Sequence, residues 1–264
     1  MLSFSSALPA FAPLTAPTLT PVAQRSAAPV METTADLEAM AKKLNPIIGF
    51  YDPLALTAGP YSALSERQAI GFLRHAEIKH GRVAMAAFVG FIFGSNGIHF
   101  PWNLQGDLSY ATIAAIPAPA AQWDALPTSA KLQILLFIGL LEVLGETVQP
   151  HYMSGGVPGK YPAFKDAGVP HFALNLFDPF GLSKNASPEK KARGLLAEIN
   201  NGRLAQIGIL AFLAEAKVPG SVPALSGLIA PYDGECMAPF SATDSGLPFV
   251  SEMLGYNLHF GWTF

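Results

Sequence analysis

A nine-residue motif occurs twice in this chain and constrains its fold more than any other feature. Residues 77–85 read Glu-Ile-Lys-His-Gly-Arg-Val-Ala-Met, and residues 198–206 read Glu-Ile-Asn-Asn-Gly-Arg-Leu-Ala-Gln, at an offset of 121 residues. An aromatic-Asp-Pro sequence precedes each copy, GFYDPLAL at 49–56 and LFDPFGL at 176–182. Two motifs repeated in the same order indicate a duplicated structural unit.

Three apolar stretches predict an all-α membrane fold with three transmembrane helices. They cover about residues 64–98, 130–147 and 192–216. Charged residues make up 13% of the chain, about half the ~25% of soluble domains, and the mean hydropathy is +0.32. Proline is frequent in the connections at 99–129 and 148–191, so these cannot be helix interiors. No stretch is an uninterrupted apolar 20-mer, because charged residues interrupt them.

The charges of the repeated motif predict how the first and third helices meet. On a helix, residues five apart are turned by roughly 140°, so Glu77 and Arg82 cannot pair well with each other. An unpartnered charge in a bilayer costs a few kcal/mol. We therefore expect two reciprocal ion pairs, Glu77 with Arg203 and Arg82 with Glu198, across a helix crossing with pseudo-two-fold symmetry. Two small residues lie between the charges, where they permit close approach: Gly81 and Gly202.

The same motif offers metal ligands. A carboxylate can accept more hydrogen bonds than one arginine donates, and magnesium prefers oxygen ligands. One turn after each glutamate, on the same face, the sequence has His80 and Asn201. Each helix therefore presents two candidate ligand positions.

Composition excludes other classes of protein. The formal net charge of −3 gives no basic surface for nucleic acid. The single cysteine, Cys236, excludes a disulfide framework or a cysteine cluster within one chain. Four histidines outside the motif are expected to be loop or interface residues: His99, His151, His171 and His259.

Residues 1–30 have the composition of a targeting segment. They contain no Asp or Glu and one basic residue, Arg25. An ordinary disordered N-terminus is the alternative. We expect residues 31–264 to form one three-helix domain.

Basic residues orient the predicted spans. They concentrate between the second and third spans and before the first span, whereas the tail after residue 217 carries four acids. The positive-inside tendency then places the N-terminus on the basic side and the C-terminus on the opposite side.

These motifs resemble the light-harvesting chlorophyll-binding family. The sequences LRHAEIKHGRVAM and QILLFIGLLE and the Asp-Pro loops resemble its chlorophyll a/c branch most, the fucoxanthin or peridinin antenna proteins. The segment ALPAFAP, residues 7–13, resembles the cleavage region of proteins targeted to secondary plastids. The resemblance implies a non-enzymatic antenna in the thylakoid membrane, with a stromal N-terminus and a lumenal C-terminus. It also implies chlorophyll a, chlorophyll c and a fucoxanthin- or peridinin-type carotenoid as cofactors. The implied partners are thylakoid lipids, a photosystem core and neighbouring antenna subunits.

The resemblance also assigns roles to residues. Magnesium of chlorophyll would be ligated at five positions: Glu77, His80, Glu142, Glu198 and Asn201. Arg82 and Arg203 would be the ion-pair partners, and Gln133 would hold a further chlorophyll through water. Asp52-Pro53 and Asp178-Pro179 would lie against the end groups of two carotenoids.

Two positions depart from the family pattern. Gln206 replaces the usual methionine, and Glu215 replaces a glutamine ligand. The Glu215 carboxylate is expected either to ligate a pigment, or to be protonated or point to solvent. For Glu142, a polar residue at the membrane boundary is the alternative interpretation.

Two other functions compete with an antenna. A photoprotective member of the same family would share the ligand motif and dissipate excitation. A three-span carrier or membrane enzyme would place Glu and His around a water-filled path. The matched, symmetric charges favour structure and pigment ligation over such a path.

Overall fold

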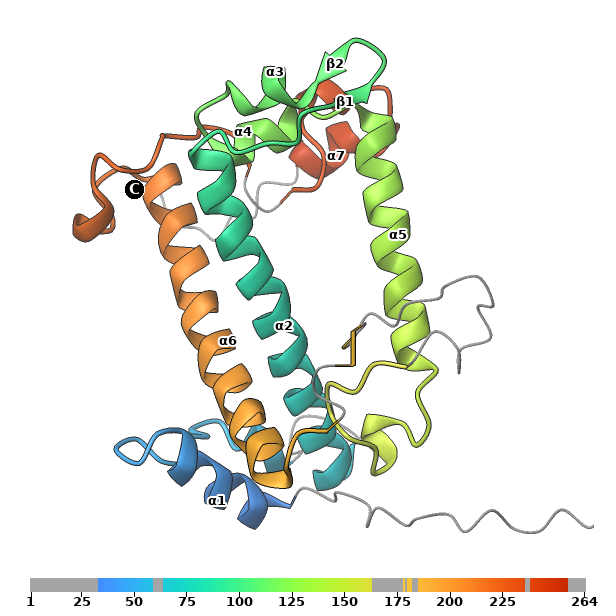
Figure 1. The fold of residues 1–264 in the computed structure, drawn as a ribbon, viewed down its shortest axis with the longest axis vertical. Helices are drawn as coiled ribbons and strands as arrows, with labels where there is room; N and C mark the ends of the chain where they lie inside the picture. Colours follow the sequence, from blue (N-terminus) through green and yellow to red (C-terminus); the bar gives the residue numbers. More distant parts are fainter. Residues whose placement is uncertain are drawn as a thin grey trace, which may run out of the picture.

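Three long helices form the framework of the protein. The computed structural model describes residues 33–58, 64–162, 178, 180–181, 185–235 and 238–255. Helices α2 (Glu66–Ser95), α5 (Thr128–Glu146) and α6 (Pro188–Lys217) lie over the stretches where the sequence predicts spans. Helices α2 and α6 run side by side in the same direction, and α5 stands apart from them (Figure 1). The expected targeting segment, residues 1–30, lies outside the described residues.

Shorter elements gather at the two ends of this framework. At one end, α1 (Thr34–Leu44) lies across the start of α2 and α6 (Figure 1). At the other end are a two-stranded antiparallel hairpin and three short helices: β1 (Asn103–Gln105), β2 (Leu108–Ser109), α3 (Tyr110–Ala114), α4 (Pro119–Asp124) and α7 (Val250–Gly255). Four 3-10 turns complete the described structure: η1 (Leu56–Ala58), η2 (Tyr152–Ser154), η3 (Pro223–Leu225) and η4 (Ala242–Asp244).

Local sequence sets where the two paired helices begin. The first amide groups of a helix have no intrahelical acceptor, so side chains near the start satisfy them. Gln68 accepts from the backbone amide of Ser65 at 2.9 Å before α2. Ser187 accepts from the amide of Lys190 before α6, and Pro188 occupies its first position, where no amide proton is needed.

Helices α2 and α6 approach each other most closely at two glycines. A Cβ atom on Gly81 would lie 3.1 Å from the Cα of Gly202, and one on Gly202 would lie 3.0 Å from the Cα of Gly81. Further along, the ring of Phe212 stacks on Phe88 and on Phe91, with ring centroids 5.0 Å apart in both pairs. The crossing therefore combines backbone contact at its centre with aromatic packing beyond it.

Helix α5 differs from the other two in composition and packing. Among the described residues it is the one helix long and apolar enough to cross a membrane by length and hydropathy, and 11% of its apolar window is buried. Its apolar side chains point outward, for example Leu136 (73% exposed) and Val143 (65% exposed). Helices α2 and α6 fall short of that criterion because they carry the motif charges. Length and hydropathy therefore support one span, within a chain that is mostly helical where it is described.

The segment after α6 folds back onto the start of α5. Lys131 in the first turn of α5 forms an ion pair with Asp244 at 2.6 Å, with side chains 0% and 1% exposed. The carboxylate of Asp244 also accepts from the Thr128 hydroxyl and from the Ser241 amide. Burial opposes the charged form of Asp244, but these hydrogen bonds outweigh it and lower its pKa from 3.8 to about 2.

A second set of contacts joins the same tail to α4 and α6. The indole of Trp123 donates to the carbonyl of Pro239 at 2.9 Å. The Tyr232 hydroxyl donates to Asp124 at 2.6 Å, and its amide donates to the carbonyl of Ala216. The tail after α6 therefore connects the ends of three helices, α4, α5 and α6.

Candidate functional site

Both predicted ion pairs between the motif copies are present. The guanidinium of Arg203 donates to Glu77 at 2.7 Å, and Arg82 donates to Glu198 at 2.6 Å. Each pair joins α2 to α6. The angular argument against pairing within one helix is therefore confirmed for both copies.

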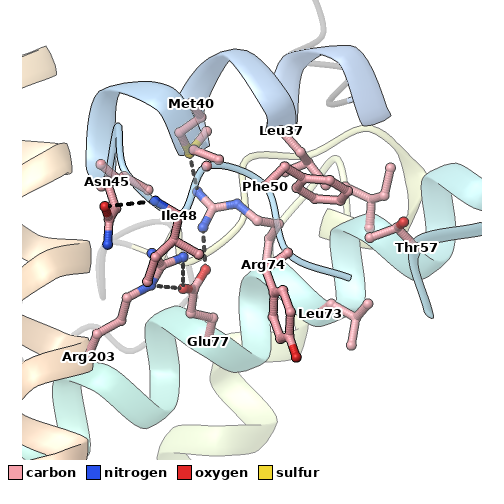
Figure 2. A pocket seen from close by; sticks show the side chains of 15 residues that line it. Leu37, Met40, Asn45, Ile48, Phe50, Thr57, Leu73, Arg74, Glu77 and Arg203 are labelled. Atoms are coloured by element: carbon pink, nitrogen blue, oxygen red, sulfur yellow. Dashed lines mark hydrogen bonds and ion pairs between the residues drawn. The ribbon is translucent and has the colours of Figure 1, made fainter. Parts of the chain in front are cut away.

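The two pairs are not equivalent. Glu77 also accepts from Arg74 at 2.5 Å, so its two oxygens face two guanidinium groups (Figure 2). Arg74 is 7% exposed and also donates to the sulfur of Met40 in α1. On the other side, Arg82 adds a hydrogen bond to the carbonyl of Gly159. Sequence reasoning missed Arg74, although its position three residues before Glu77 places both on one helix face.

A cavity of about 430 Å³ adjoins the first ion-pair cluster. Helix α1, the loop at residues 45–57 and the charged side chains of Glu77, Arg74 and Arg203 line it (Figure 2). The cavity therefore combines an apolar wall from α1 with a carboxylate from α2, which suits a large apolar ligand with one coordinating atom.

The tautomer of His80 leaves a free ring nitrogen. Its Nδ1 lies 2.8 Å from the carbonyl oxygen of Ala76. A carbonyl oxygen only accepts, so Nδ1 carries the proton and Nε2 of the neutral ring keeps its lone pair. Metal-ligating histidines commonly donate their other N–H to a backbone carbonyl in this way. His80 is exposed, and so is Asn201, its counterpart on α6.

The predicted ligands on α5 lie on its exposed surface. Glu142 is exposed and accepts from Lys79 of α2 at 2.6 Å. Lys79 also lies 3.6 Å from Glu146, which accepts from His151 at 2.8 Å. Gln133 donates to the carbonyl of Ser129 at 3.2 Å, which leaves its amide oxygen available. The Lys79–Glu142 pair, which the sequence did not suggest, connects α2 to α5.

Glu215 has a different surrounding from the one expected. It is 2% exposed, and its two oxygens accept from the amides of Gly220 and Val222, both at 2.8 Å. The alternative that its carboxylate points to solvent is therefore wrong, because these amides hold the carboxylate in the turn after α6, and the pigment-ligand alternative stays a prediction. In this position it fixes the start of the tail.

Of the two Asp-Pro loops, the structure describes both residues of the first and only the aspartate of the second. Asp52 accepts from the amide of Leu56 and from the amide and hydroxyl of Thr57, and the Thr57 groups lower its pKa below the usual range. Pro53, beside it, is exposed. Asp178 has a left-handed backbone with φ of 49°, and its carbonyl accepts from the amide of Gly181. Its neighbour Pro179 lies outside the described residues.

Comparison with known proteins identifies the class to which this arrangement belongs. Residues 36–217 match the family model described as Chlorophyll A-B binding protein, which is more than half of the chain. The chain belongs to this family of chlorophyll-binding proteins.

Individual relatives narrow the resemblance to one branch. A fucoxanthin-chlorophyll a-c binding protein of Trieres chinensis is 33% identical over 193 residues, which cover 67% of this chain and 78% of the relative. Protein F of the same description from Phaeodactylum tricornutum is 33% identical over 174 residues, covering 66% and 76%. Protein A from Macrocystis pyrifera is 31% identical over 215 residues, covering 80% and 85%. The predicted resemblance to the chlorophyll a/c branch is confirmed.

Proposed function

We propose that this protein is a light-harvesting antenna subunit that binds chlorophyll a, chlorophyll c and a fucoxanthin-type carotenoid. The observation that carries the proposal is the paired motif. Its charges neutralise one another between α2 and α6, while His80 and Asn201 stay exposed next to them. The names of the relatives supply the kinds of pigment. Neither the carrier nor the membrane-enzyme alternative accounts for exposed ligands beside neutralised charges.

The residues fit such pigments in three ways. His80 would offer Nε2 as a ligand because its Nδ1 faces a backbone carbonyl, and Glu77, Glu198, Asn201 and Glu142 would add oxygens that suit magnesium. The cavity beside Glu77 has an apolar wall. Helix α5 presents apolar side chains outward without extensive packing on α2 or α6. Bound pigments would absorb light and pass on excitation, while the protein fixes their ligands in place.

The remaining predicted positions have unequal support. Gln133 retains a free amide oxygen for a water-mediated contact. Asp52 and Pro53 form a well-bonded loop near the Glu77 cavity, which suits a carotenoid end group. Asp178 and Pro179 are proposed for the second carotenoid from the repeat alone. Glu215, with both oxygens bonded to backbone amides, supports the fold better than it supports a ligand role.

We further propose that α2, α5 and α6 all cross the thylakoid membrane and that α2 and α6 are related by pseudo-two-fold symmetry. Each motif glycine lies midway along a 30-residue helix, which would place the neutralised charges near the bilayer centre. The basic residues at the α1 end favour the stroma for that end and the lumen for the tail. Residues 1–30 are proposed to direct the chain to the plastid, and a photosystem core and other antenna subunits are the proposed partners.

Purification in mild detergent tests the antenna function. We expect chlorophylls a and c and a carotenoid to co-purify, and the carotenoid band to appear in the excitation spectrum of chlorophyll fluorescence. A pigment-free protein would overturn the proposal. If the pigments are bound but the excited-state lifetime of chlorophyll is strongly shortened, the result would favour the photoprotective, energy-dissipating alternative.

A further inference from the structure

A second apolar cavity, of about 440 Å³, lies at the end of α2 opposite α1. The last turns of α2, the loop that follows, α3 and α4 form its walls. Its lining is dominated by large apolar side chains: Phe93, Ile98, Phe100, Tyr110, Ile113 and Trp123. None of the ligand positions considered above lies in this cavity.

One imidazole lies in this mostly apolar lining. His99 lines the cavity, and its Nδ1 lies 2.9 Å from the carbonyl oxygen of Phe100. By the same reasoning as for His80, Nδ1 carries the proton and Nε2 of the neutral ring keeps its lone pair. The two histidines therefore share one feature, a ring fixed by a backbone carbonyl 2.8–2.9 Å away.

The walls of the cavity are held in place by hydrogen bonds and close contacts. The side-chain amide of Gln122 donates to the carbonyl of Gly94 at 2.9 Å and to that of Ile116 at 2.7 Å. A Cβ on Gly94 would lie 3.0 Å from Gln122 and 3.3 Å from Pro119. These contacts fix α4 against the end of α2, so the cavity does not depend on a mobile lid.

We infer that this cavity binds a chlorophyll whose magnesium takes the Nε2 atom of His99 as axial ligand. The inference rests on the proposed antenna function, which supplies the ligand class. A magnesium tetrapyrrole needs one donor atom in a mostly apolar site, and this cavity provides both, because the Gln122 side-chain amide in its wall is already bonded to two backbone carbonyls. A carotenoid would use the apolar walls but leave the imidazole lone pair without a partner.

The glycine at position 90 allows the cavity to be tested separately from the ligand. Gly90 lines this cavity and a neighbouring one beside α6, and a Cβ built on it meets no heavy atom within 4 Å. Gly90→Leu should therefore reduce the space for a ligand at this wall, with no clash at the Cβ. Gly194 is a matched control, because it also has open space around it but lies near the start of α6.

The experiment reconstitutes the full chain with chlorophylls a and c and carotenoid and counts pigments per chain. We expect His99→Gly and Gly90→Leu each to lose about one chlorophyll and no carotenoid, whereas Gly194→Leu keeps the full set. Added imidazole should restore the lost chlorophyll to His99→Gly but not to Gly90→Leu.

Three results would overturn the inference while leaving the antenna function intact. They are an unchanged chlorophyll count in both variants, loss of carotenoid instead of chlorophyll, and failure of imidazole to restore binding. A wild-type chain that binds no chlorophyll would instead overturn the proposed function itself.

Discussion

The unequal surroundings of the two motif glutamates predict unequal effects of mutation. Glu77→Gln removes the carboxylate that Arg74 and Arg203 share, and the side chain of Arg74 is 8% exposed. Breaking a buried pair typically costs about 3–5 kcal/mol because a charge is left behind. We expect Glu77→Gln to lower the free energy of unfolding by about this amount.

The matched variant at the other pair should be milder. Glu198→Gln keeps an oxygen that can accept from Arg82, and Arg82 also retains its bond to the carbonyl of Gly159. A loss of about 1–3 kcal/mol is expected, the cost of one weakened polar contact.

Removing both charges of the first pair should restore only part of the stability. Glu77→Val combined with Arg203→Leu eliminates one cation but still deprives Arg74 of its bond to Glu77. Adding Arg74→Met should recover most of the remainder. Stability can be followed by detergent-titrated unfolding of the reconstituted protein, with helical circular dichroism as the signal.

A comparison of the free energies of unfolding of these variants can refute this reasoning. If Glu198→Gln destabilises as much as Glu77→Gln, the buried Arg74 contributes nothing to the first cluster. Equal stability of the double and triple variants would lead to the same conclusion.

Three further predictions concern other contacts. Asp244→Asn should release the tail, giving faster proteolysis of residues 218–255 than in wild type. Because the folded pKa of Asp244 is about 2, against 3.8 ordinarily, its contribution to stability is complete above about pH 4 and is lost as the pH falls through about 2. The tail should therefore stay protected from protease at pH 5. Gly202→Val places a branched side chain against a backbone 3.0 Å away and should prevent reconstitution, whereas Gly194→Val, with open space around its Cβ, should reconstitute as the wild type does. His80→Leu should lose about one chlorophyll per chain by pigment analysis.

Each of these has a clear opposing result. Tail cleavage at pH 5 equal to that of Asp244→Asn would show that the buried pair with Lys131 does not hold the segment. Normal pigment yield from Gly202→Val would show that the helices do not need close contact at this point. An unchanged chlorophyll count in His80→Leu would make His80 a surface residue with no ligand role.

The sequence predicted the centre of the structure because the repeat encodes it locally. The five-residue spacing of Glu77 and Arg82 excludes an ion pair within one helix and leaves ion pairs between the two motif helices. Gly81 and Gly202 mark the point where these helices come into contact. Arg74 escaped notice because its charge belongs to one copy of the motif only, so the repeat does not reveal it. A search for charges three residues from each glutamate would have found it.

Contacts made by the tail could not be predicted in this way. Lys131 and Asp244 are 113 residues apart and belong to no repeat or periodic pattern. Glu215 reads as a polar residue near a helix end, and only the fold shows that backbone amides surround it. Helix α1 is short and mixed in composition, so its position across α2 and α6 follows from tertiary contacts and not from its sequence.

Helix α5 is attached to the protein mainly at its two ends. Lys79 holds one end through Glu142, and Asp244 holds the other through Lys131. Between these ties its side chains carry little of the packing that stabilises the fold. The middle of α5 is thus a surface that can change residue by residue without repacking a core. Substitutions in the middle of α5 could therefore change which pigments or neighbouring subunits the antenna contacts. The paired helices α2 and α6 would still determine whether the chain folds.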